Sequence, residues 1–366
     1  MAALEDRKLK NKTSDGLLEA LRKLPVITRE PVVLPLSRGD REIDAKIEFG
    51  AGGREYLLLV KTRKSVYPVD ARQAFWQLKR HAESIGGSDK GKQIIPLVVA
   101  ESISPGGKEF LKSKNFGFYD TGGSLFITAR DIYVYIEKPP PKIFRRSIRS
   151  LFTGRRSQVL HALLIRHNEW FGVKDLAQFA EVSLATTSET LSALERFDWL
   201  VVEGQGPSKK RKLANPAALL DEWREQTPTA LQRQTRHRFY VPLCAPDDIA
   251  HRLDDICEGL GLRYVLTEQS AAQTYAPFLT HVLRLTCRLE FGSCMKELCA
   301  RLEARDVNEG ANLEVIKTRS SGEFLFRERV GTVWLASPVQ VYLDLLRSEG
   351  RSKEIAEHLR HERMGF

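Results

Sequence analysis

The stretch VKDLAQFAEVSLATTSETLSALERFDWLVVEGQG, residues 173–206, decides the fold of the middle of the chain. Its apolar residues predict a short helix over 173–181 and a longer one over 184–200, separated by the two-residue turn Val182-Ser183. Ser183 is a good N-cap for the longer helix. The segment 201–213 then predicts two short strands around a Gly-Gln-Gly-Pro turn. Amphipathic helices are expected on either side, over 157–172 and 217–225.

This order of helix, helix, turn, helix and hairpin resembles the winged helix-turn-helix superfamily. The resemblance implies that the third helix enters the major groove of DNA with its first residues on the base edges. The third-helix candidates for DNA contact carry hydroxyl groups: Ser183, Thr186, Thr187, Ser188 and Thr190. Such hydroxyls can meet a phosphate or a base edge, and a Thr methyl can pack on thymine. None of these residues is an Arg, Asn or Gln, which are the residues that usually recognise a base through two hydrogen bonds.

Positive charge is concentrated around the same segment. The 366 residues include 57 Lys and Arg against 47 Asp and Glu, a net charge of +10. Residues 1–141 hold 24 basic and 18 acidic residues and residues 142–226 hold 14 and 10, whereas the rest holds 19 of each. Two basic runs bracket the predicted module, and clustered charge of this kind is typical of nucleic-acid binding. The candidate phosphate contacts are Arg145, Arg146, Arg149, Arg155 and Arg156 before the module, and Lys209, Lys210, Arg211 and Lys212 in its hairpin.

Prolines and polar runs divide the chain. The sequence EKPPPKIF, residues 137–144, is typical of an extended connector, and residues 221–239 form a softer, polar boundary. We expect three domains, over 1–141, 142–234 and 235–366, in a mixed α/β and α+β architecture. No apolar run of about 18 residues predicts a membrane span. Five cysteines without metal-ligand spacing suggest buried, reduced thiols in a cytoplasmic protein, and we expect no metal or other cofactor.

The first segment predicts a hairpin over 41–61, a helix after Pro68, a strand over 94–100, a helix over 108–114 and strands at 118–119 and 125–127. This order resembles the restriction-endonuclease-like nucleases with the PD-(D/E)xK signature. In that comparison Asp44 matches the first carboxylate, Lys61 the lysine and Gln77 a glutamine of the following helix. The second acid should be residue 59, which is Leu59. A divalent metal needs oxygen ligands, so we expect a degenerate domain without catalysis. Recruitment of a nearby acid remains an alternative, with three candidates: Glu42, Glu48 and Glu55.

The last segment predicts a strand over 237–243, a helix over 247–261, a strand over 281–290 and a hairpin formed by 312–320 and 322–330. Its end, ASPVQVYLDLLRSEGRSKEIAEHLR, resembles the C-terminal region of AbiEi-type antitoxins of type IV toxin–antitoxin systems. The resemblance implies a bacterial repressor of its own operon that counteracts a nucleotidyltransferase-like toxin. The residues that carry it are Ser337, Pro338, Val339, Tyr342, Asp344, Leu345, Arg351 and 356–360. Alternatively, Tyr342 and Asp344 are ordinary helix residues, one buried and one exposed.

Taken together, these features predict a cytoplasmic transcriptional regulator that binds double-stranded DNA as a possible homodimer, away from membranes, and is not an enzyme. Two alternatives stay open. One is a metal-dependent endonuclease that the winged helix directs to DNA. The other is a protein-interaction module that neutralises a toxin.

Overall fold

The computed structural model describes residues 13–37, 40, 42–85, 91–139, 148–226, 236–242, 245–290, 295–318, 320–348 and 350–366. The chain forms two compact units. The first comprises Met1–Arg149 with Leu191–Leu200, and the second comprises Ser150–Thr190 with Val201–Phe366. The sequence predicts three domains, whereas the middle and C-terminal segments belong mostly to one unit. The predicted boundary at 234 lies outside the described residues.

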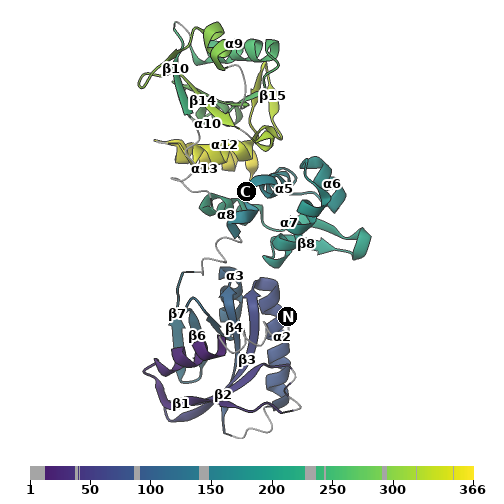
Figure 1. Cartoon of the computed structure of the whole chain (residues 1–366), viewed down its shortest axis with the longest axis vertical. Coiled ribbons are helices and arrows are strands. Elements are labelled where there is room, and N and C mark those ends of the chain that lie inside the picture. Colours follow the sequence, from purple (N-terminus) through teal and green to yellow (C-terminus); the bar gives the residue numbers. More distant parts are fainter. Residues whose placement is uncertain are drawn as a thin grey trace. The chain divides into compact units, whose positions relative to one another are not determined.

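A seven-stranded sheet organises the first unit, with its strands in chain order (Figure 1). Strands β3, β4 and β5 are parallel, and the remaining neighbours are antiparallel. The predicted order of hairpin, helix, strand, helix and strand is confirmed. The elements are β1 (Ile27–Leu34), β2 (Ala45–Ala51), β3 (Arg54–Val66), α2 (Pro68–Ile85), β4 (Gln93–Ile103), α3 (Pro105–Ser113), β5 (Gly117–Asp120), β6 (Leu125–Ala129) and β7 (Ile132–Ile136).

Helices cover both faces of this sheet, which explains the unbroken apolar run Leu57–Val60 in β3. On one face, Leu58 and Val60 pack with Leu17 and Leu21 of a helix over residues 13–22. On the other face, Leu57 and Leu59 pack with residues of α2 and α3. Residues Leu191–Leu200 join this unit, where Asp198 pairs with Arg72.

The middle segment shows the helix order that the sequence predicts. The elements are α5 (Gly154–Ile165), α6 (Val173–Phe179), α7 (Leu184–Arg196), β8 (Leu200–Glu203), β9 (Lys210–Leu213) and α8 (Pro216–Gln226). Strands β8 and β9 form a separate two-stranded sheet. Helix α5 ends seven residues earlier than the sequence suggests, and α7 ends four residues earlier.

A second seven-stranded sheet occupies the C-terminal part, in the order β13-β10-β14-β12-β11-β16-β15. Its strands are β10 (Arg236–Tyr240), β11 (Tyr264–Leu266), β12 (Leu285–Glu290), β13 (Arg305–Asp306), β14 (Leu313–Thr318), β15 (Glu328–Val330) and β16 (Val333–Leu335). Its helices are α9 (Pro246–Gly259), α10 (Glu268–Tyr275), α11 (Met295–Leu302), α12 (Pro338–Leu345) and α13 (Ser352–Leu359). The mixed α/β architecture predicted for the chain is thus confirmed.

The hairpin predicted around Ser321 is wrong. Strand β14 lies parallel to β12 and antiparallel to β10, and β15 pairs instead with β16. Between β14 and β15, Ser321–Phe324 form a short 3-10 helix, η2. The segment between β14 and β15 is therefore not a tight turn. Its helix η2 places Glu323 beside Arg288, with which Glu323 forms an ion pair.

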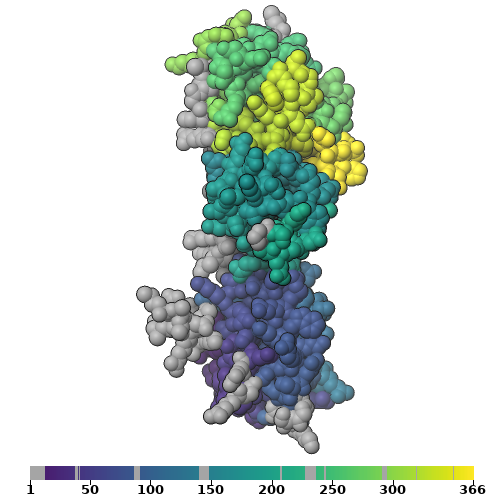
Figure 2. Space-filling model, turned by 90° about the vertical axis from the view of Figure 1, so that its right-hand side faces the viewer, coloured from purple at the N-terminus to yellow at the C-terminus, as the bar shows by residue number. Residues whose placement is uncertain are grey.

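Within the second unit, the C-terminal residues lie against the helices of the middle segment, yellow beside teal in Figure 2. The rings of His167 and Phe366 are 4.9 Å apart, in an edge-on arrangement. Cys257 and Cys287 are buried, as expected of small apolar residues, whereas Cys244 and Cys294 lie outside the described residues. In the described part of the chain, no helix has the length and apolar character needed to cross a membrane.

Candidate functional site

The turn between α6 and α7 is built by backbone geometry and a cap. Glu181 adopts a left-handed conformation with φ +53°, which ends α6 sharply. The amide of Val182 then donates to the carbonyl of Ala177 at 3.0 Å. Ser183 Oγ accepts a hydrogen bond from the amide of Thr186 at 3.3 Å, as its predicted N-cap role requires. Helix α7 therefore starts at a fixed angle directly after a four-residue turn.

The hydroxyl residues of α7 do not share one face. Ser183 and Ser188 are exposed and Thr186 is half-buried, but Thr187 and Thr190 are fully buried. Thr187 Oγ1 donates to the carbonyl of Ser183, and Thr190 Oγ1 donates to the carbonyl of Thr186, at 3.0 and 2.7 Å. We expected Thr187 and Thr190 to be accessible for DNA contact. Their burial shows that they are not.

The reason for this burial is helical periodicity. Positions 187, 190, 191 and 194 lie on one stripe of α7, and Leu191 and Leu194 are fully buried there. The outer surface instead presents Leu184, Ala185 and Ser188. The spacing of Thr187 and Thr190 relative to Leu191 and Leu194 could have revealed their burial.

The hairpin β8–β9 presents its basic residues unequally. Lys210 is exposed, and Lys209 and Lys212 are half-buried. Arg211 is buried, with only 6% of its surface exposed, and its backbone exchanges two hydrogen bonds of 2.9 and 3.0 Å with Phe171. Successive side chains of a strand point to opposite faces, so Arg211 and Leu213 turn inward together. The expectation that Arg211 is an accessible phosphate contact is corrected.

The predicted arginines before the module also differ. Arg145 and Arg146 lie outside the described residues, and exposed Arg149 belongs to the first unit. Arg155 is exposed at the start of α5. Arg156 donates to Glu189 at 3.1 Å, which places a cation directly beside the outer surface of α7.

The nuclease-like positions lie together in the first unit. Asp44 and Lys61 form an ion pair of 3.6 Å, and Asp44 also accepts from the amide of Thr62 at 2.8 Å. Leu59 is fully buried, so an apolar side chain fills the position of the missing acid. Gln77 of α2 accepts a hydrogen bond from Arg63 at 3.1 Å.

Two of the three alternative acids, Glu48 and Glu55, are held by cations. Glu48 pairs with Arg29 and with Lys92, and Glu55 pairs with Arg29. Among the residues that the structure describes, no group of three His, Cys, Asp or Glu side chains is arranged to hold a metal ion. Asp44 and Lys61 partly neutralise each other's charge.

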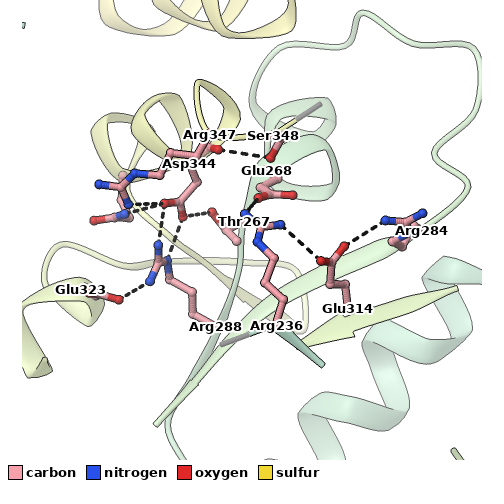
Figure 3. A network of polar contacts seen from close by, with 11 residues as sticks. Arg236, Thr267, Glu268, Arg284, Arg288, Glu314, Glu323, Asp344, Arg347 and Ser348 are labelled. Carbon is pink, nitrogen blue, oxygen red and sulfur yellow. Dashed lines mark hydrogen bonds and ion pairs between the residues drawn. The ribbon is translucent and has the colours of Figure 1, made fainter. Parts of the chain in front are cut away.

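Sequence reasoning missed a buried ionic network in the C-terminal part (Figure 3). Asp344 of α12 is fully buried and accepts hydrogen bonds from both Nε and Nη2 of Arg288 in β12. Thr267 and Gln340 donate to the same carboxylate at 2.6 and 2.9 Å. Asp344 is therefore not the exposed helix residue that one interpretation of the sequence allowed, and Tyr342 beside it is buried too.

Charge balance favours the ionised form of Asp344 in this network. Burial alone would raise the pKa of Asp344, but the charge and hydrogen bonds of Arg288 outweigh it and hold the pKa below its ordinary value. For Glu268, burial outweighs the attraction of Arg236 and raises the pKa. Arg236 bridges Glu268 and Glu314 at 2.7 and 3.4 Å. The network thus fixes α10 and α12 on the sheet. Arg288 stands in the polar phase of the alternating strand, so its burial has no local signal in the sequence; both faces of β12 are covered.

Comparison with known proteins places the C-terminal part in context. Residues 212–364 match the model of a family described as a transcriptional regulator, the AbiEi antitoxin of type IV toxin–antitoxin systems. The resemblance predicted from residues 337–360 is confirmed for this part of the chain. The match begins at the end of the hairpin and includes the whole buried network. No curated protein and no solved structure matches the chain.

Proposed function

We propose that the protein is a DNA-binding transcriptional regulator of the type IV antitoxin kind, whose middle segment acts as a winged helix. The family match over residues 212–364 supports the regulatory role. The order of α5, α6, α7 and the β8–β9 hairpin supports the winged helix. In this proposal α7 enters the major groove, and the hairpin follows the phosphate backbone.

One observation carries the proposal: the outer surface of α7 is accessible and has the cation of Arg156 beside it. Ser183 and Ser188 are exposed, Arg156 pairs with Glu189 beside them, and Lys210 is exposed in the hairpin of the same unit. Phosphate groups are the natural partners of such cations. Thr187, Thr190 and Arg211 support these surfaces from the inside.

Selection of bound fragments from a random duplex library, followed by a footprint, tests this function. We expect a protected site whose affinity falls steeply between 50 and 200 mM salt, as counterion release requires for about 6 to 10 phosphate contacts. A homodimer would protect two half-sites related by two-fold symmetry. Absence of any salt-dependent duplex binding would overturn the proposal.

We further propose that the first unit is a degenerate restriction-endonuclease-like domain without catalysis. The support is Leu59, which supplies no metal ligand between Asp44 and Lys61. Supercoiled plasmid incubated with the protein and Mg²⁺ or Mn²⁺ should stay intact. Cutting that disappears in Asp44→Ala would establish a metal-dependent endonuclease instead.

The antitoxin kind of regulator also implies a protein partner. We propose a nucleotidyltransferase-like toxin, encoded next to this protein, as that partner. Co-expression should relieve the growth arrest that the toxin alone causes, and relief by a variant unable to bind DNA would separate neutralisation from repression.

A further inference from the structure

The outer surface of α7 begins with an exposed apolar pair. Leu184 is 56% exposed, and Ala185 beside it is exposed as well. Leu191 and Leu194, further along the same helix, are fully buried, so the exposure of Leu184 reflects its position as the first residue of α7. A single exposed leucine is common on protein surfaces, so its surroundings decide what it binds.

Those surroundings offer few hydrogen bonds to a base. Ser183 Oγ caps the helix and also donates to Thr186 Oγ1 at 3.0 Å. Thr187 and Thr190 donate inward to backbone carbonyls. The exposed side chains of the first two turns are therefore the apolar Leu184 and Ala185, followed by Ser188 and the Arg156-paired Glu189.

The electrostatics of the surroundings favour a polyanion. Arg156 neutralises Glu189, the acid nearest to this pair on α7, and Lys210 and Arg155 are exposed in the same unit. Among the base edges in a duplex, the 5-methyl group of thymine is the one that offers apolar surface in the major groove. An exposed apolar pair on a helix that carries the Arg156–Glu189 pair, in a unit with further exposed cations, is compatible with that combination of methyl groups and phosphates.

We propose that Leu184 and Ala185 contact thymine methyl groups in the major groove and thereby select the binding site. This inference rests on the proposed function, because it requires α7 to enter the groove. In this proposal, Leu184 and Ala185 determine specificity through apolar contact and not through two hydrogen bonds to one base. Each buried methyl group should contribute about fourfold in affinity.

Deoxyuridine substitution isolates this contact, because uracil keeps every hydrogen-bonding edge of thymine and lacks only the methyl group. The probe is the duplex recovered by selection, with thymines in the protected half-site replaced by deoxyuridine singly and together. The full-length protein should bind the substituted duplex about fourfold more weakly for each contacted methyl group. The slope of log affinity against log salt should stay the same, because no phosphate contact is lost.

Protein variants assign the effect to the helix. At the thymine that Leu184 contacts, the Leu184→Ala variant should bind the duplex with thymine and the duplex with deoxyuridine with nearly equal affinity. Leu283→Ala is the matched control, because Leu283 is 82% exposed elsewhere in the same unit and should leave discrimination unchanged. Unfolding curves of both variants should match that of the wild-type protein, because both side chains are exposed.

The outcomes separate the two proposals. Salt-dependent binding with equal affinity for thymine and deoxyuridine duplexes overturns the methyl contact and leaves the DNA-binding function standing. Discrimination that persists unchanged in Leu184→Ala overturns the assignment to this helix. Absence of duplex binding overturns both proposals.

Discussion

His161 of α5 and Ser337 at the N-cap of α12 share a hydrogen bond of 2.5 Å between Nε2 and Oγ, although they are 176 residues apart in the chain. Both side chains are buried, with 4% and 1% of their residue surfaces exposed. Ser337 Oγ also accepts from the amide of Gln340, so one hydroxyl caps α12 and binds α5. This contact is one of those that join the middle and C-terminal segments in one compact unit. A change at either side chain should be felt by both segments.

Replacement of His161 should change how stability depends on pH. Burial lowers the pKa of His161 to about 3, whereas the unfolded chain has a value near 6.5. Between these values the unfolded state binds the proton and the folded state does not, so the stability present above pH 6.5 is lost as the pH falls. Urea unfolding should show a loss of up to about 1.4 kcal/mol for each pH unit below 6.5.

In His161→Phe this slope should be reduced, because the side chain no longer titrates. The variant should also be less stable at pH 7.5, where it lacks the bond to Ser337. His361→Gln provides the control, since the His361 side chain is 85% exposed. An equal slope in the wild-type protein and in His161→Phe would show that other groups cause the pH dependence.

Removal of Asp344 should destabilise the second unit strongly. Asp344→Ala leaves Arg288 buried with only part of its charge balanced, because Glu323 remains its other partner. Breaking a buried ion pair typically costs about 3–5 kcal/mol. Denaturant unfolding should show a loss of this size, whereas Glu354→Ala, which removes an exposed pair with Arg351, should change stability little.

The double variant Arg288→Met, Asp344→Leu distinguishes the charge from the packing. If the cost of Asp344→Ala arises from the uncompensated charge, the double variant should be more stable than the single one. A double variant as unstable as Asp344→Ala would instead attribute the loss to altered packing around α12.

Replacing two neighbouring basic residues of the hairpin should affect two different properties, DNA affinity and stability. Lys210→Ala should weaken duplex binding and reduce the slope of log affinity against log salt by about 0.9, the value for one phosphate contact. Arg211→Ala should instead lower the unfolding midpoint, because Arg211 is buried where the hairpin meets Phe171. Lys353→Ala, at an exposed position of α13, should change neither quantity. Equal DNA-binding losses in the Lys210 and Arg211 variants would contradict this division.

The sequence predicts the elements of the middle segment well because local signals mark each boundary. Ser183 caps α7, and the Gly-Gln-Gly-Pro run turns the hairpin, where Gly204 and Gly206 have φ of +75° and +60°. It predicts accessibility less well. Thr187 and Arg211 are polar and still lie inside, because each occupies an inward position of its helix or strand.

Local sequence patterns do not predict which strands or side chains pair when they are far apart in the chain. Residues 312–330 have the spacing of a hairpin, but β14 pairs with β12, which is more than twenty residues away. Arg288 and Asp344 are 56 residues apart, and no local pattern joins them. The edge strands β1 and β7 were missed: polar residues 28–30 interrupt the apolar pattern of β1, whereas β7, with the sequence IYVYI, carries a strand pattern that was overlooked.

The close approach of Gly322 to Gln158 should make this glycine intolerant of a side chain. A Cβ atom at Gly322 would lie 2.2 Å from Gln158 Nε2 and 2.8 Å from its Cδ, and Gln158 is itself buried. Gly322→Ala should therefore cost about 1–3 kcal/mol of stability, the usual range for overpacking.

In a Gln158→Ala background the substitution Gly322→Ala should cost much less, because the colliding atoms are absent. A double-mutant cycle by denaturant unfolding measures this coupling. Gly259→Ala is the control, since its Cβ would meet only Arg301 at 4.0 Å. Equal costs of Gly322→Ala in both backgrounds would show that α5 and η2 do not meet at this point.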